Sequence, residues 1–196
     1  MRGRHGLAVL LAVVVALVAP GLASAATGTM TGQVFGPDDA PLAGAQVIAF
    51  SDTIAVATAT TDAGGAYSLE VAPGNYAVKL KPAAVAPLDQ LGAVPAALWY
   101  PGAYARVDAA QVTVNAGTTT ALADVQLPLE GVITGSLHFP DGSPARASAL
   151  AYDAQGHLVG SGRGLAYGDA RYVIRGLPPG PLRVLFTATR RPGRWR

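Results

Sequence analysis

The sequence predicts an all-β protein made of two tandem antiparallel β-sandwiches that follow an N-terminal signal peptide. Three features of the 196 residues support this prediction: short segments in which apolar and polar residues alternate, Gly- and Pro-containing turns between these segments, and a second, looser copy of the same pattern. Alternation with a period of two gives a strand one buried and one solvated face. Short strands separated by turn signals, with no long helical period, are typical of a sandwich.

Residues 1–25 have the features of a signal peptide. Arg2 and Arg4 give a positive start, residues 7–19 are an unbroken apolar run, and Ala-Ser-Ala at 23–25 is a small-x-small cleavage site. The alternative is an uncleaved membrane anchor, but the run is shorter than the roughly 20 residues that a spanning helix needs. We therefore expect cleavage, secretion, and no stable membrane span in the mature protein.

The first unit, residues 26–128, contains a clear hairpin pattern in TDAGGAYSLEVAPGNYAVKL, residues 61–80. Two runs of alternating residues, expected to be strands over 66–71 and 75–81, lie on either side of a Pro-Gly turn, and an Asp and two glycines precede them. The side chains expected to point into the core are Tyr67, Leu69, Val71, Tyr76, Val78 and Leu80. Further strands are expected at 30–35, 45–50, 54–60, 111–115 and 119–127.

The second unit, residues 129–196, repeats landmarks of the first. Gly28, Gly32 and Pro41 recur 103 residues later as Gly131, Gly135 and Pro144, Tyr67 recurs as Tyr172, and Pro73-Gly74 recurs as Pro179-Gly180. The first unit continues for 53 residues after Gly74 to Leu127, but the chain ends 16 residues after Gly180, so the second sandwich is expected to lack its last strands. Either the sequence is truncated, or a strand-donating partner or an oligomer covers the open edge.

The motifs of the first unit resemble one known family. G-x-V at 32–34, PLAGAQV at 41–47, TDAGGAYSL at 61–69 and APGNYAVKL at 72–80 follow one another as in a carboxypeptidase regulatory-like domain. The resemblance covers residues 28–127 and implies a transthyretin-like (prealbumin-like, Ig-like) sandwich of about seven strands. It also implies a non-catalytic module, of a kind found on exported enzymes and adhesins, and similar to starch-binding-like and Cna-B-like modules.

Residues able to perform catalysis are scarce. The absence of cysteine excludes disulfides, a thiolate nucleophile and thiolate metal ligands. His138 and His157 belong to no metal-binding motif, and GSGRGLAYG around Ser161 is neither a nucleophile elbow nor a dinucleotide loop, so we expect a flexible loop there. Asp38 and Asp39 lie in a turn, and Asp62 and Asp141 precede glycines in turns, where aspartate accepts backbone hydrogen bonds. We expect no catalytic residue, no metal ligand and no cofactor.

Charge is divided unevenly along the chain. There are 14 basic and 12 acidic residues, and removal of residues 1–25 with their two arginines leaves 12 of each. Residues 26–128 hold three basic and eight acidic side chains, whereas 129–196 hold nine and four. The only dense basic cluster, RRPGRWR at the end, has no aromatic interleaving elsewhere, so a nucleic-acid partner is not expected. The excess of arginine over lysine and the abundant Ala, Gly and Pro suggest a bacterial protein.

The best candidate for a binding surface is the loop ALWYPGAYARV, residues 97–107, with Trp99, Tyr100 and Tyr104. Aromatic rings on a loop can stack on sugars; the alternative is that Trp99 or Tyr100 plugs the end of the sandwich. We expect an extracellular, non-enzymatic binding module that is carbohydrate-binding-like or adhesive, with a polysaccharide or a cell-surface protein as partner. The alternative is a pair of accessory domains from a truncated secreted hydrolase, amylase-like or carboxypeptidase-like.

Overall fold

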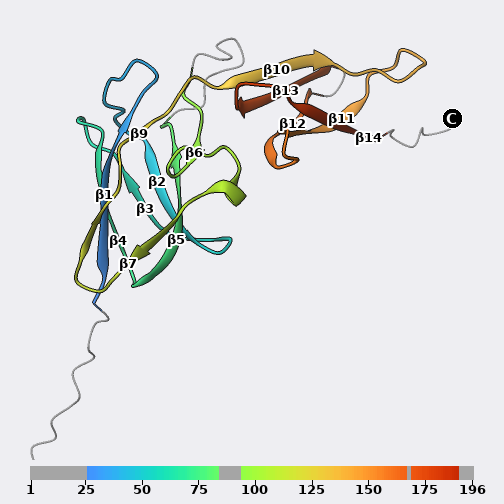
Figure 1. The fold of residues 1–196 in the computed structure, drawn as a ribbon. Helices are drawn as coiled ribbons and strands as arrows, with labels where there is room; N and C mark the ends of the chain where they lie inside the picture. Colours follow the sequence, from blue (N-terminus) through green and yellow to red (C-terminus); the bar gives the residue numbers. More distant parts are fainter. Residues whose placement is uncertain (1–25, 84–93, 167–168, 190–196) are drawn as a thin grey trace, which may run out of the picture.

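The computed structural model of the protein describes residues 26–83, 94–166 and 169–189. The expected signal peptide and the basic end of the chain lie outside these residues. The described part is all-β apart from one 3-10 turn, η1 (Arg106–Asp108), and its strands form two units (Figure 1). Among the described residues, no helix is long and apolar enough to cross a membrane.

The first unit is a two-layered sandwich, as predicted. Its strands are β1 (Gly28–Phe35), β2 (Gln46–Ser51), β3 (Ile54–Thr60), β4 (Ala66–Val71), β5 (Gly74–Lys81), β6 (Leu98–Trp99), β7 (Gln111–Val114), β8 (Thr119–Ala121) and β9 (Val125–Gln126). One sheet has the order β4-β1-β8, with β9 also on β1, and the other has the order β3-β2-β5-β6, with β7 also on β5.

The single strand expected over 119–127 is two short strands, and both run parallel to β1. β8 pairs with Thr29–Thr31, whereas β9 pairs with Val34 and Phe35. The segment between them leaves the ladder after Leu122, whose N–H donates to the Thr31 carbonyl at 2.8 Å. The chain therefore follows β1 with one interruption, and the sandwich is antiparallel everywhere except at this edge.

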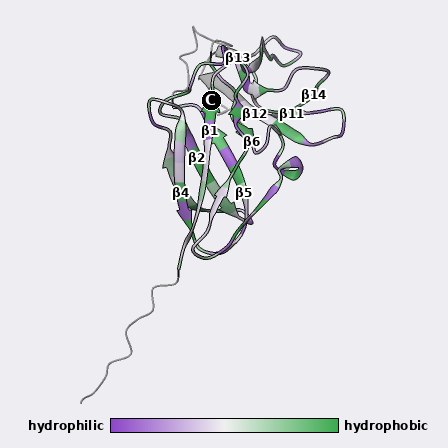
Figure 2. Ribbon diagram, turned by 60° about the vertical axis from the view of Figure 1, so that its left-hand side comes forward, coloured by the Kyte–Doolittle hydropathy of each residue, from purple (hydrophilic) through white to green (hydrophobic). Residues whose placement is uncertain are grey.

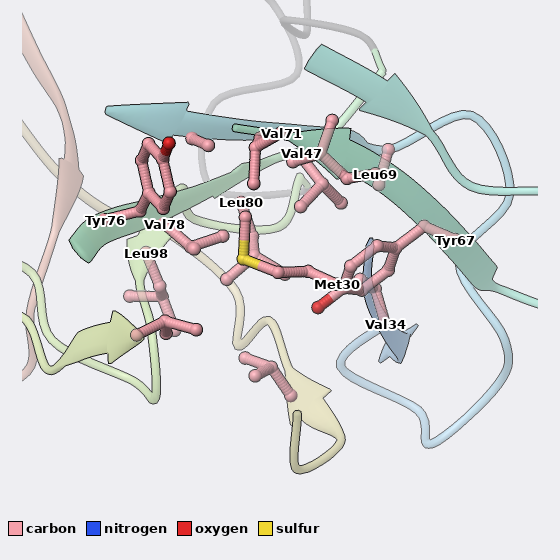
Figure 3. Packing of buried hydrophobic residues seen from close by; sticks show 14 of the residues in the cluster. Met30, Val34, Val47, Tyr67, Leu69, Val71, Tyr76, Val78, Leu80 and Leu98 are labelled. Carbon is pink, nitrogen blue, oxygen red and sulfur yellow. The ribbon is translucent and has the colours of Figure 1, made fainter. Parts of the chain in front are cut away.

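The core of the first unit lies between the two sheets. All six side chains expected to point inward are buried, with exposed fractions of 1–6% for five of them and 0% for Val78. They pack around Met30, which lies between Tyr67 and Leu80 in Figure 3. Each such side chain contributes about 1.5–3 kcal/mol on burial. Hydrophobic and hydrophilic residues alternate along the strands, as Figure 2 shows, so each sheet buries one face only.

The second unit is one antiparallel sheet in the described part of the chain. Its strands are β10 (Gly131–Ser136), β11 (Arg146–Tyr152), β12 (Leu158–Ala166), β13 (Asp169–Leu177) and β14 (Arg183–Thr189), in the order β10-β13-β12-β11-β14. A smaller core of Ala149, Ala151, Ile174 and Leu177 lies on it. Three of its pairings have counterparts in the first unit: β10–β13 corresponds to β1–β4, β11–β12 to β2–β3, and β11–β14 to β2–β5.

A glycine faces a tyrosine across the first pairing in both units. Gly32 is opposite Tyr67, and Gly135 is opposite Tyr172. A Cβ atom on Gly32 would lie 2.8 Å from the Tyr67 hydroxyl, and one on Gly135 would lie 2.6 Å from the Tyr172 hydroxyl. Each tyrosine ring thus packs directly on the backbone of the facing strand. Only glycine, which has no Cβ, leaves room for the ring at this position.

The prediction of a flexible loop around Ser161 is wrong, because this segment is strand β12, which pairs with β11 on one side and β13 on the other. Its glycines suit this position. A Cβ on Gly160 would approach Leu177 Cδ2 to 2.5 Å and Ile174 Cγ2 to 3.3 Å. Because glycine has no side chain, Leu177 and Ile174 of the small core can pack directly against the sheet backbone. This packing favours a strand although the glycines have a high turn propensity.

Candidate functional site

The aromatic loop is anchored to the first unit by main-chain hydrogen bonds. β6 pairs with β5, and Trp99 and Ala103 exchange two N–H to carbonyl bonds of 2.7 Å that close a tight turn. The Tyr100 N–H donates to the Val78 carbonyl at 2.8 Å, and the Tyr100–Pro101 peptide is cis. β6 was not predicted, because it is a two-residue strand inside a segment with the composition of a loop.

Trp99 lies against Phe50 of β2 and is 8% exposed. The two ring centroids are 5.1 Å apart at an interplanar angle of 57°. Lys79 Nζ lies 5.0 Å and the Arg106 guanidinium carbon 5.5 Å from the Trp99 ring centroid, in the range of cation–π contacts. Burial, with a smaller effect from Lys81, lowers the pKa of Lys79. The indole is therefore enclosed by neighbours of its own unit.

The two tyrosines of the loop have different surroundings. Tyr100 packs partly against the core, and its hydroxyl accepts a hydrogen bond of 3.2 Å from the Ala123 N–H. Tyr104 also packs partly against the core, burial raises its pKa, and its buried hydroxyl has no hydrogen-bond partner in the described residues. Of the three aromatic residues, Tyr104 lines a cavity; a ligand role for all three stays a prediction.

That cavity is a groove of about 350 Å³ between the two units. The first unit contributes the segment from Gly102 to Ala105 together with Asp108, and the second unit contributes the β11–β12 turn and the segment between β13 and β14. The apolar lining consists of three alanines and the larger residues Tyr104, Val159, Pro178, Pro179, Pro181 and Leu182, and the polar lining of Asp108, Asp153 and Gln155. An apolar wall with a few polar groups is the usual composition of a ligand site.

A polar cluster joins the two units at this groove. His157 Nδ1 lies 3.0 Å from Asp108 Oδ2 and 3.6 Å from Asp153 Oδ2. Asp153 Oδ1 accepts hydrogen bonds from the Gln155 N–H at 3.0 Å and the His157 N–H at 2.8 Å, which fixes the carboxylate. The sequence predicts no metal ligands, and this cluster is not evident from it. The D-x-x-x-H spacing of Asp153 and His157 was a visible signal, but Asp108 is 45 residues away in the chain.

The linker between the units is held by a second ion pair. The Glu130 carboxylate, 6% exposed, accepts a hydrogen bond from Arg175 Nε at 2.9 Å and pairs with the same guanidinium through Nη2. Its other oxygen accepts from the Gly176 N–H at 3.1 Å. These bonds fix the start of the second unit to the end of β13, directly before the prolines of the groove.

The aspartates expected in turns are confirmed as turn residues. Asp62 Oδ1 accepts hydrogen bonds from the Gly64 N–H at 2.8 Å and the Ala66 N–H at 3.0 Å. Asp141 Oδ1 accepts from the Ser143 N–H at 3.1 Å, and Asp38 Oδ1 accepts from the Ala40 N–H at 3.4 Å. These carboxylates organise backbone N–H groups within their own loops.

Comparisons with solved structures find distant likenesses. The chain is 21% identical to the Bacillus anthracis TIE protein, with a TM-score of 0.36, over 83% of this chain and 28% of that one. It is 12% identical to a DUF3823 family protein from Bacteroides ovatus (TM-score 0.32, 83% and 81% covered). It is 11% identical to a putative adhesin from Bacteroides ovatus (TM-score 0.31, 87% and 70% covered). The chain thus spans little more than a quarter of the TIE protein.

The comparison with curated proteins finds no match. The family model of the carboxypeptidase regulatory-like domain matches residues 29–128. This range begins within β1 and ends two residues after β9, so it covers the two-sheet sandwich described above and just over half of the chain. By this match and this fold, the chain belongs to the carboxypeptidase regulatory-like domain family.

Proposed function

We propose that this protein is an exported, non-catalytic binding module whose groove between the two units holds a segment of polysaccharide. The observation that carries the proposal is the lining of the groove. Tyr104 and the three prolines offer apolar surface to the carbon–hydrogen face of a sugar, while Asp108, Asp153 and Gln155 offer acceptors and a donor to its hydroxyls. A groove of about 350 Å³ is also within the size range of small-ligand sites.

The roles of the carboxylates support a non-catalytic module. Asp38, Asp62 and Asp141 each accept hydrogen bonds from backbone N–H groups of their own turns. Asp108 and Asp153 both lie against His157, in a junction between units. The first three carboxylates are thus engaged by their own turns, whereas a glycosidase needs one carboxyl as an acid and one as a base or nucleophile.

The proposal includes a tandem organisation, with a signal peptide over 1–25 and units over 26–128 and 129–196. The three shared strand pairings and the repeated glycine–tyrosine contact support a second copy of the first unit. In the first unit β8 and β9 lie on β1, and β7 lies on β5, whereas the described strands β10 and β14 are at the ends of their sheet. A strand-donating partner for these edges stays a prediction.

Retention of the purified protein on a panel of immobilised neutral polysaccharides tests the proposal. The informative variant is Tyr104→Leu, which keeps apolar volume against the core but removes the aromatic face. The matched control is Tyr152→Leu, since Tyr152 is a partly buried tyrosine that does not line this groove. We expect retention by the parent and the control, and several-fold weaker retention by Tyr104→Leu.

Two results would contradict the proposal. One is the absence of retention on the whole panel. The other is retention that Tyr104→Leu leaves unchanged, because the groove wall would then not take part in binding. Trp99→Ala is a poor probe of the same question, because Trp99 packs on Phe50 and its removal also perturbs the sheet.

A further inference from the structure

Three side chains that commonly bind metals converge beside the groove, whose lining includes two of them, Asp108 and Asp153. The ligand atoms of Asp108, Asp153 and His157 all lie within 4.8 Å of one another. The side chains retain exposed fractions of 47%, 19% and 32%, respectively, so water can reach the cluster. Asp108 ends η1 of the first unit, whereas Asp153 and His157 flank the β11–β12 turn of the second.

The two carboxylates of the cluster offer more hydrogen-bond acceptors than the single Nδ1–H of His157 can satisfy. Both Oδ2 atoms face His157 Nδ1, which carries at most one hydrogen. A hydrogen bond to Asp108 at 3.0 Å uses that hydrogen and leaves the Asp153 Oδ2 atom, at 3.6 Å, without it. The second oxygen of Asp153 is occupied by two backbone N–H groups, so Oδ2 is the atom that remains for a cation.

Two of the three separations between the ligand atoms are close to those around a small divalent cation. Zinc bonds to imidazole nitrogen and carboxylate oxygen are about 2.0–2.2 Å long, so tetrahedral ligand atoms stand roughly 3.3–3.6 Å apart. The two distances from His157 Nδ1 are 3.0 and 3.6 Å, which bracket this value. One imidazole with two carboxylates suits zinc and similar transition metals better than the all-oxygen set of calcium.

We propose that Asp108, Asp153 and His157 form a binding site for a divalent transition-metal ion of the Zn²⁺ type that bridges the two units. Because the ligands come from both units, the ion stabilises the arrangement in which the groove exists. This inference does not rest on polysaccharide binding, and its test uses no sugar.

The test measures Zn²⁺ binding to the purified, metal-stripped protein, prepared without a histidine tag. Competition with a chromogenic chelator gives the affinity and stoichiometry, and the unfolding temperature with and without Zn²⁺ gives a second readout. Asp108→Asn and His157→Gln each remove one ligand from a different unit while keeping side-chain size. The controls are Asp124→Asn and His138→Gln, which change an exposed aspartate and an exposed histidine outside the cluster.

We expect one Zn²⁺ per chain, a rise in unfolding temperature on binding, and at least tenfold weaker binding in both cluster variants, with the controls unchanged. Absence of saturable binding would overturn the proposal. It would also be overturned if His157→Gln weakened binding but Asp108→Asn did not, because the ion would then be held by the second unit alone.

Discussion

The contact between Gly32 and Tyr67 makes a sharp prediction for Gly32→Ala. The new methyl group would lie 2.8 Å from the Tyr67 hydroxyl and 3.1 Å from two ring carbons, where ordinary contacts are 3.4–4 Å. Tyr67 is 6% exposed and packs in the core, so its ring can retreat only by displacing core neighbours. Overpacking of this kind costs about 1–3 kcal/mol.

The matched control is Gly102→Ala, because a Cβ at Gly102 meets no atom within 4 Å. At about 4–8 °C per kcal/mol for a domain of this size, Gly32→Ala should lower the unfolding temperature of the first unit by roughly 5–20 °C. Gly102→Ala should leave it nearly unchanged. Tyr67→Phe removes the nearest of the clashing atoms, so it should restore part of the loss when combined with Gly32→Ala.

Urea titration followed by tryptophan fluorescence measures this effect in the first unit. Trp99 belongs to that unit, and Trp195→Phe removes the chain's other tryptophan from the signal. If Gly32→Ala unfolded at the same urea concentration as Gly102→Ala, the ring would not be fixed over the glycine, and the reasoning would be refuted. Gly135→Ala should act in the same direction on the second unit, where the corresponding distance is 2.6 Å.

Tyr67 and Thr61 give further predictions for stability. Burial, with smaller effects from Tyr100 and Asp124, raises the pKa of Tyr67 to about 12 from 10.0. The unfolded chain therefore loses this proton at lower pH than the folded protein, so stability is full below pH 10 and falls between about pH 10 and 12. The difference of about two between the folded and unfolded pKa values corresponds to about 3 kcal/mol of folding stability. In Tyr67→Phe, the urea concentration at the unfolding midpoint should therefore depend less on pH across this window than in the parent protein. Thr61, 5% exposed, donates to the Leu42 carbonyl at 2.6 Å and accepts from the Ala45 N–H at 2.9 Å. Thr61→Val should cost about 2–4 kcal/mol because two backbone groups lose their partner, and a loss no larger than that of the exposed change Thr58→Val would contradict this role.

The β4–β5 hairpin could be predicted because each of its strands buries one face, so that alternate side chains lie in the core and in solvent; its strands differ from the expected 66–71 and 75–81 by at most one residue at an end. β3 also lies over the expected residues, although its side chains are exposed or only partly buried. β6, β8 and β9 have two or three residues each, too few for a period to show. β12 was missed for the opposite reason: its glycines signal a turn locally, but their use is to let Leu177 and Ile174 approach the backbone.

The candidate site could be predicted only in part. Tyr104 attracts attention in the sequence because it lies in an aromatic loop. Its partners in the groove come from other segments, and no spacing rule joins Asp108 to Asp153 or to Leu182. Their meeting depends on how the second unit is placed on the first, and this depends on contacts at the linker that have no local sequence signature.

The contacts at the linker explain why both units are needed to form the groove. Glu130 comes directly before β10 and binds both the Arg175 side chain and the Gly176 N–H at the far end of β13. The chain then passes through Pro178, Pro179 and Pro181, whose fixed φ angles limit where the segment can go. The wall with Tyr104 belongs to a turn that is hydrogen-bonded to β5, and the wall with the three prolines follows a segment that is bonded to the Glu130 side chain. Both walls are therefore held by contacts outside the groove. A ligand or metal ion would therefore meet surfaces that are already placed, and would bind without the cost of ordering them.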